Sequence, residues 1–173
     1  MLSEMLGELN ASHTGCRYYG GTASLSTAAL GAFFDPNYEG DGLKIQEVIK
    51  RGPFAVKKNE ITAGCIIEKI DGEAIKAGED YNALLDGKAG KNVRLTIKNT
   101  KGKTFDLTIK AISQGNQQEL LYKRWVDRNR AIVDSVSKGR IAYVHVKAMN
   151  SESFRTVYSE LLSDKNRNKD AVI

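Results

Sequence analysis

The sequence contains little cysteine and little proline, with two residues of each among 173. Cys16 and Cys65 are far apart and belong to no CxxC or Cys/His spacing, so neither a disulfide framework nor a zinc site is supported. No apolar run approaches the ~20 residues that a membrane-spanning helix needs. Residues 1–4 lack the basic start and apolar centre of a signal peptide. We therefore predict no metal, no cofactor and no membrane span.

The chain also lacks a large excess of one charge. It has 26 Lys and Arg against 21 Asp and Glu, a net charge of +5 and a pI near 9.1. A nucleic-acid site would need these basic residues gathered on one face, whereas they are scattered. In residues 88–110 the lysines alternate with apolar residues, which is typical of the solvent-facing side of a hairpin. We predict no nucleic-acid partner.

Residues 28–112 consist of short runs with a period of two, separated by Gly, Asp, Asn and Pro, which predicts a strand-rich module. Thr100-Lys101-Gly102 predicts a hairpin turn between the last two runs. Asp80 is expected to cap a helical stretch through Leu85, which Gly87 ends. The expected strands cover residues 32–35, 43–49, 65–70, 92–99 and 103–112.

Helical spacing returns on both sides of this module. Residues 2–10 predict a short amphipathic helix. Residues 117–136 predict a longer helix that Lys138-Gly139 ends. Its apolar stripe is expected to be buried, and its Lys and Arg side chains are expected to form a solvated face. The stripe comprises Leu120, Leu121, Trp125, Ile132, Val133 and Val136, and the basic residues are Lys123, Arg124, Arg128 and Arg130.

The last third of the chain has the order strand, helix, strand. An apolar strand is expected over residues 141–146, an amphipathic helix over 154–162, and a second strand from residue 171. This order predicts the beginning of a βαβ unit. Because the sequence stops inside an apolar strand, we expect it to be a fragment of a longer protein.

Two blocks of the central module resemble the signature of PDZ domains. They are Gly52-Pro53-Phe54-Ala55 and Ala63-Gly64-Cys65-Ile66-Ile67-Glu68-Lys69-Ile70-Asp71-Gly72-Glu73-Ala74-Ile75, with Cys65 where an aspartate is usual. Ala29-Leu30-Gly31-Ala32 resembles the loop whose backbone N–H groups bind a peptide carboxylate in that family. The resemblance implies a groove between the strand after this loop and the helix near residue 81. The implied peptide-binding residues are Leu30, Gly31, Ala32, Phe33, Tyr81 and Leu84. A groove that is empty, or filled by the protein's own chain, remains the alternative.

The flanks resemble tricorn proteases, serine peptidases related to the carboxyl-terminal processing peptidases. The resemblance rests on three blocks in the family's order, Gly7-Glu8-Leu9-Asn10-x-Ser12-His13-Thr14, Arg124-Trp125-Val126-x-x-Asn129-Arg130-x-x-Val133 and Ser137-Lys138-Gly139-x-Ile141-x-Tyr143-Val144-His145-Val146. It implies that residues 1–27 end a first catalytic segment, residues 28–113 form a PDZ domain, and residues 114–173 begin a truncated second segment. The expected fold class is α+β: a PDZ-like β-sandwich or partly open barrel with one or two helices. An N-terminal helix and a helix-strand-helix piece of an α/β catalytic domain are expected to flank it.

The same resemblance implies the roles of three residues. His13 follows the first helix, where it can titrate near neutrality and reach a substrate, and the resemblance makes it the general base. Ser12 is implied to orient its imidazole. The aligned oxyanion donor is the backbone N–H of Asn150, although Asn150 or Ser151 can equally cap the next helix. His145 is expected to be packed and hydrogen-bonded in a strand.

No serine of this sequence occupies the nucleophile's position, which in the family follows a glycine-rich turn after the strand that starts here at Ala171. We therefore expect a parent serine peptidase that hydrolyses peptides or protein C-termini, and a fragment that is inactive alone. The alternative is a non-catalytic PDZ-type module that binds peptide C-termini. The expected partner is a peptide or unfolded protein. A homo-oligomeric parent, and either the cytoplasm or the cell envelope of a prokaryote, remain open.

Overall fold

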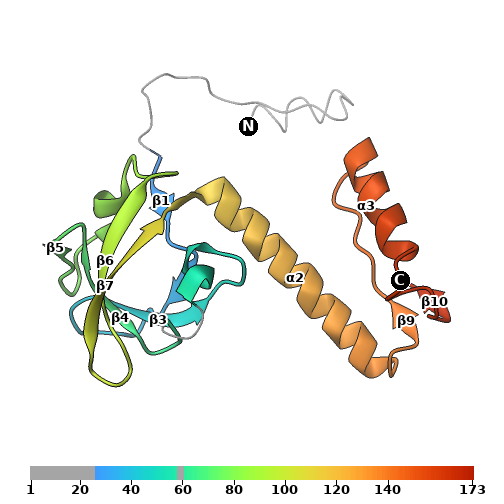
Figure 1. The fold of residues 1–173 in the computed structure, drawn as a ribbon, viewed down its shortest axis with the longest axis horizontal. Coiled ribbons are helices and arrows are strands. Elements are labelled where there is room, and N and C mark those ends of the chain that lie inside the picture. The colour runs from blue at the N-terminus through green and yellow to red at the C-terminus, as the bar shows by residue number, and fades with distance from the viewer. Residues whose placement is uncertain (1–25, 58–60) are drawn as a thin grey trace, which may run out of the picture.

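The alternating residues of the central module build an antiparallel sheet (Figure 1). The computed structural model describes residues 26–57 and 61–173. The strands follow the order β2-β3-β4-β6-β7, and β5 pairs with β4. The five expected strands are therefore confirmed, with slightly different ends. Their bounds are β2 (Ala32–Phe34), β3 (Leu43–Val48), β4 (Ile66–Ile70), β5 (Glu73–Ala74), β6 (Asn92–Lys98) and β7 (Thr104–Lys110).

The hairpin between β6 and β7 is confirmed. Lys98 pairs with Thr104, and Gly102 in the turn has a φ of 81°. The Asn99 side chain accepts hydrogen bonds from the backbone N–H groups of Lys101 and Lys103 at 3.0 and 2.9 Å. Because a positive φ suits glycine and an Asn side chain readily closes a turn, these residue types explain why the chain reverses here.

Short elements close the module. A second small sheet joins β1 (Ala28–Ala29) to β8 (Ile112–Ser113), so the two ends of the module lie together. The expected helix after Asp80 is the 3-10 helix η2 (Tyr81–Leu85), and the Asp80 side chain accepts from the N–H of Asn82 at 3.0 Å, as predicted. A further 3-10 helix, η1 (Pro53–Lys57), follows the Gly52-Pro53 motif.

The hydrophobic core lies inside this module. Burial of the apolar side chains of this core supplies the main favourable free energy of folding. The largest fully buried side chains lie in β3, β4, β6 and the short helices or directly next to these strands, and they are Ile45, Ile49, Phe54, Cys65, Ile67, Ile70, Leu85, Val93, Leu95 and Ile97. Of the buried hydrophobic residues in the described part of the chain, only Ala142 lies beyond residue 111.

The C-terminal third extends from the module along one long helix (Figure 1). Helix α2 (Gln114–Val136) begins at its N-cap Ser113 and ends before Lys138 and Gly139, whose φ values are 53° and 81°. It is followed by β9 (Ile141–Ala142), α3 (Ser151–Leu161) and β10 (Ala171–Val172). Strands β9 and β10 are parallel, with Ala171 opposite Ile141, which confirms the strand, helix, strand prediction.

Three predictions for this region are wrong. The first strand ends at Ala142 rather than residue 146. The apolar stripe of α2 is not buried, since Trp125, Ile132 and Val136 are 46%, 50% and 80% exposed. Helical spacing identifies an apolar face but does not supply the layer that covers it, and α2 leads away from the sheet (Figure 1). The basic face is also not simply solvated, because Arg124 and Arg130 form ion pairs.

No helix within residues 26–57 and 61–173 is long and apolar enough to cross a membrane.

Candidate functional site

The loop at residues 29–32 connects β1 to β2 and has a backbone that requires glycine. Gly31 has a φ of 74°, and a Cβ added to it would lie 2.4 Å from Cδ of Pro53. Its carbonyl accepts a hydrogen bond from Ile49 N–H at 2.9 Å, which ties the loop to the end of β3. The Gly52-Pro53 motif therefore packs directly against the loop that resembles the carboxylate-binding loop of PDZ domains.

A cavity of about 250 Å³ opens beside this loop. It lies against β2 and η2, and its walls combine apolar side chains with amides. The lining residues are Ala28, Ala29, Leu30, Ala32, Phe33, Phe34, Tyr81, Asn82, Leu85, Gln114 and Gln117. Strand β2 is the terminal strand of its sheet and, among the described strands, pairs only with β3. An extended peptide could therefore add to its other edge.

Tyr81 forms the helical side of this cavity. Its ring packs edge-on against Phe34, with ring centroids 5.7 Å apart. Burial, together with the negative charge of Asp80, raises the pKa of the Tyr81 hydroxyl above its usual value of 10. The phenol is therefore neutral at pH 7 and presents an apolar ring to the cavity.

The structure brings most of the predicted peptide-binding residues together. Leu30, Ala32, Phe33 and Tyr81 all line the cavity. Gly31 is not among the lining residues, but its backbone N–H donates to Gln117, which is. Leu84 packs against the core and is also not among the lining residues.

The sequence did not identify two glutamines at this cavity. Gln114 and Gln117 lie in the first turns of α2. The half-buried side-chain oxygen of Gln117 accepts a hydrogen bond from the N–H of Gly31 at 3.2 Å. No local pattern signals this contact, because it depends on where α2 packs after the chain has passed through the whole sheet.

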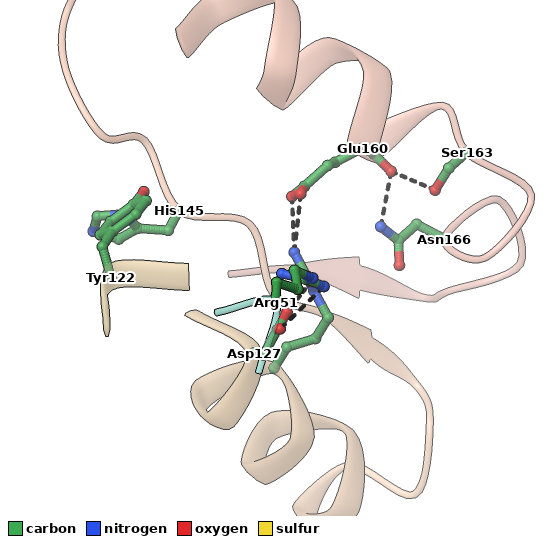
Figure 2. Close-up of polar contacts among 8 residues, drawn as sticks. Arg51, Tyr122, Asp127, His145, Glu160, Ser163 and Asn166 are labelled. Carbon is green, nitrogen blue, oxygen red and sulfur yellow. Dashed lines mark hydrogen bonds and ion pairs between the residues drawn. The ribbon is translucent and has the colours of Figure 1, made fainter. Parts of the chain in front are cut away.

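His145 lies outside the cavity, on the chain after β9. Its Nδ1 is 2.8 Å from the hydroxyl of Tyr122, and the Trp125 ring packs edge-on against its ring at a centroid distance of 4.8 Å. The predicted hydrogen bond is confirmed, and Figure 2 shows the Tyr122 and His145 side chains next to each other, with their rings tilted by 59°. Through these contacts His145 joins the segment after β9 to α2.

Asn150 is the N-cap of α3. Its side chain accepts a hydrogen bond from Ser153 N–H at 2.8 Å, so the capping alternative is confirmed. Its φ is −143°, which is extended and not left-handed. Its own N–H donates to the carbonyl of Ala148 at 3.0 Å.

Charged side chains hold α2 to α3. Arg130 lies between Asp127, at 3.2 Å, and both carboxylate oxygens of Glu160, at 3.0 Å. Asp127 and Glu160 are labelled in Figure 2. Ser163 and Asn166 donate to the backbone carbonyl of Glu160. The charges and hydrogen-bonding groups of these residues are paired with one another, which indicates a structural network rather than a reactive centre.

A second ion pair nearby joins Lys169 to Asp134. A hydrogen bond from the Lys169 ammonium, reinforced by its charge, lowers the pKa of the Asp134 carboxyl. Asp134 is therefore ionised at neutral pH and holds the segment before β10 against α2.

His13 and Ser12, the predicted base and orienting hydroxyl, lie outside the described residues. Within the described ranges, no group of three or more His, Cys, Asp or Glu side chains is arranged to hold a metal ion.

The chain is similar to tricorn proteases. Residues 37–114 match the family model described as the tricorn protease PDZ domain. The chain is 30% identical over 177 aligned positions to a putative tricorn-like protease C-terminal subunit of Sulfurisphaera tokodaii, covering 96% of the chain and 20% of that protein. It is 28% identical over 177 positions to a tricorn protease homolog of Saccharolobus solfataricus, covering 96% of the chain and 16% of that protein.

The fold is similar as well. A crystal structure of the tricorn protease superimposes with a TM-score of 0.66 and 25% identity, over 79% of this chain and 14% of that one. The chain spans about a fifth or less of the length of these curated relatives.

Proposed function

The chain is tricorn-like and carries a PDZ domain of the tricorn protease type, and from this we propose that its groove binds peptide C-termini for a serine peptidase. The observation that carries the proposal is the glycine loop at residues 29–32. It opens onto a cavity lined by apolar side chains and amides, beside the edge of β2 that no described strand pairs with. A backbone N–H in such a loop can bind a carboxylate, and the free strand edge can pair with the residues that precede it.

The chemistry of the cavity suits this ligand. Leu30, Phe34 and Tyr81 offer apolar surface to a terminal side chain, and the lining residues include no Asp or Glu that would repel a carboxylate. A cavity of about 250 Å³ has room for one side chain and the terminal group, so we assign it to the last residue of a peptide.

Binding is tested with fluorescein-labelled decapeptides that end in Ala, Val, Leu or Phe, each with a free and with an amidated C-terminus. We expect the free carboxylate to bind at least about tenfold more tightly, because hydrogen bonds to a charged acceptor are about twice as strong as neutral ones. Tyr81→Ala should weaken binding, whereas Tyr38→Ala removes a tyrosine away from the cavity and should not. Equal binding of free and amidated peptides would contradict the proposal.

For the parent peptidase we propose that His13 is the general base, Ser12 orients its imidazole, and the N–H of Asn150 serves as oxyanion donor after leaving the carbonyl of Ala148. The serine nucleophile is not among residues 1–173 in this proposal, so the 173-residue chain should hydrolyse no peptide. In the parent protein, His13→Ala should lower kcat by at least about 10³-fold, whereas His145→Ala should not. Turnover by the 173-residue chain that disappears in His13→Ala would refute this assignment.

The alternative function is a binding module without chemistry. A binding module needs only the peptide-binding groove. Peptide hydrolysis by the parent protein that depends on His13 would therefore exclude this alternative.

A further inference from the structure

The donor that should recognise a peptide carboxylate already has an intramolecular partner. The N–H of Gly31 donates to the side-chain oxygen of Gln117, 86 residues further along the chain. Gln117 also lines the cavity. An amide oxygen is a neutral acceptor with the same planar shape as half of a carboxylate, so it can occupy the position of a ligand oxygen.

Helix α2 holds Gln117 in this place through other residues of the same face. Gln117, Leu120 and Arg124 are spaced by three and four residues and lie on one side of the helix. A Cβ added to Gly52 would lie 3.5 Å from Cδ1 of Leu120, and Arg124 forms two hydrogen bonds to Glu47 of β3, at 2.7 and 2.6 Å. The helix is therefore anchored beside the loop without the Gln117 hydrogen bond.

We propose that Gln117 is an intramolecular competitor for the carboxylate-binding loop, a role that rests on the peptide-binding function proposed above. In the free protein its amide oxygen accepts from Gly31 N–H. A peptide carboxylate takes over this donor, and the Gln117 side chain rotates away while α2 keeps its position. The carboxylate is the stronger acceptor because it is charged.

This competition sets the minimum affinity that a peptide needs in order to bind in the groove. Every ligand that uses Gly31 N–H must first break the same hydrogen bond, so all of them are weakened by the same factor. Tight ligands with a free carboxylate still bind. Weak neutral ligands, such as an internal peptide segment or an amidated end, then bind too weakly to occupy the groove at working concentrations.

The test is peptide binding by the full chain with Gln117→Ala, using the same labelled decapeptides. Since one neutral hydrogen bond contributes about 0.5–1.5 kcal/mol, we expect binding to be roughly 2- to 10-fold tighter than in the wild type, for free and amidated peptides alike. Gln117→Glu places a charged acceptor on the loop and should weaken binding of the free carboxylate by at least about tenfold. Thermal unfolding of each variant shows whether the module is intact.

Gln118 provides the matched control. It is the same residue type on the same helix turn, is exposed, and does not line the cavity. Gln118→Ala and Gln118→Glu should leave binding within about twofold of the wild type, which separates a contact at the loop from a general effect of helix charge.

The outcomes separate the two proposals. Weaker binding of free peptides by Gln117→Ala would show that Gln117 contacts the ligand, and unchanged binding would show that its hydrogen bond does not compete. Either result overturns the competitor while leaving the groove function intact. If neither the wild type nor Gln117→Ala binds any of the peptides, the peptide-binding function is overturned, and the competitor with it.

Discussion

Asp71 stabilises the turn between β4 and β5 through both its backbone and its side chain. Its φ is 52° and that of Gly72 is 93°, a pair that suits a two-residue hairpin turn. The carboxylate accepts hydrogen bonds from Arg94 N–H at 2.8 Å and from the Lys88 ammonium at 2.5 Å. These partners, Lys88 first, lower the pKa of the Asp71 carboxyl.

Asp71→Asn and Asp71→Ala should separate the backbone and charge contributions of this residue. Asparagine tolerates a positive φ and can still accept from Arg94, whereas alanine can do neither well. At pH 7 we expect Asp71→Ala to lower the free energy of unfolding by about 1–2 kcal/mol and Asp71→Asn by about 0.5 kcal/mol. Urea unfolding measures both, and an alanine variant as stable as the asparagine variant would contradict the backbone argument.

The same variants carry a prediction about pH. The folded pKa of Asp71 lies below its unfolded value of about 3.9, so its stabilising effect is present above that value and is lost as pH falls through the folded pKa. The stability difference between wild type and Asp71→Asn should therefore shrink below about pH 4. The difference between the two variants comes from the positive φ and from the hydrogen bond with Arg94 N–H, neither of which titrates in this range, so it should stay constant with pH.

Local patterns in the sequence explain which elements could be predicted. The strands and the β6–β7 hairpin follow from alternation and from turn residues such as Asn99 and Gly102, which act over a few positions. The exposed stripe of α2 could not be foreseen, because burial depends on a layer elsewhere in the protein. The position of Gln117 at the cavity could not be predicted for a related reason, since its partner Gly31 is distant in sequence. The positions of His13 and Ser12 stay a prediction.

A bidentate ion pair is one of the contacts that join helix α2 to the sheet. The guanidinium of Arg124 bonds to both oxygens of Glu47 and lies 5.6 Å from the centroid of the Phe33 ring. Two parallel hydrogen bonds fix the direction of the helix as well as its distance from β3.

A double-mutant cycle with Glu47→Gln and Arg124→Gln should measure this anchor. Because both side chains are about two-fifths exposed, we expect a coupling free energy of only about 0.5–1 kcal/mol. Lys123→Gln removes the same charge from an exposed neighbouring position and should show no coupling to Glu47→Gln. A coupling as large for Lys123 as for Arg124 would mean that general charge, not the bidentate contact, attaches the helix.

The part of the molecule that the structure describes divides into a region with a core and a region without one. Between Ala28 and Ala111 the side chains of two sheets and two short helices enclose a common interior. Beyond it, α2 and α3 contribute no fully buried residue, and large apolar side chains remain exposed, among them Met149, Phe154 and Ile173. Ion pairs and the β9–β10 pairing hold this part together.

This division predicts two classes of amide in hydrogen exchange on the full chain. Amides of β4 and β6 are enclosed by buried Ile67, Val93 and Ile97 and should exchange only when the whole module unfolds. Amides of α3 and of the second half of α2 are equally hydrogen-bonded, but few apolar contacts oppose their opening, so they should exchange at least about 100-fold faster. The first turns of α2, anchored by Leu120 and Arg124, should fall between the two classes. Equal protection from β4 to α3 would mean that the polar network around Arg130 couples the C-terminal third to the core as strongly as apolar packing does.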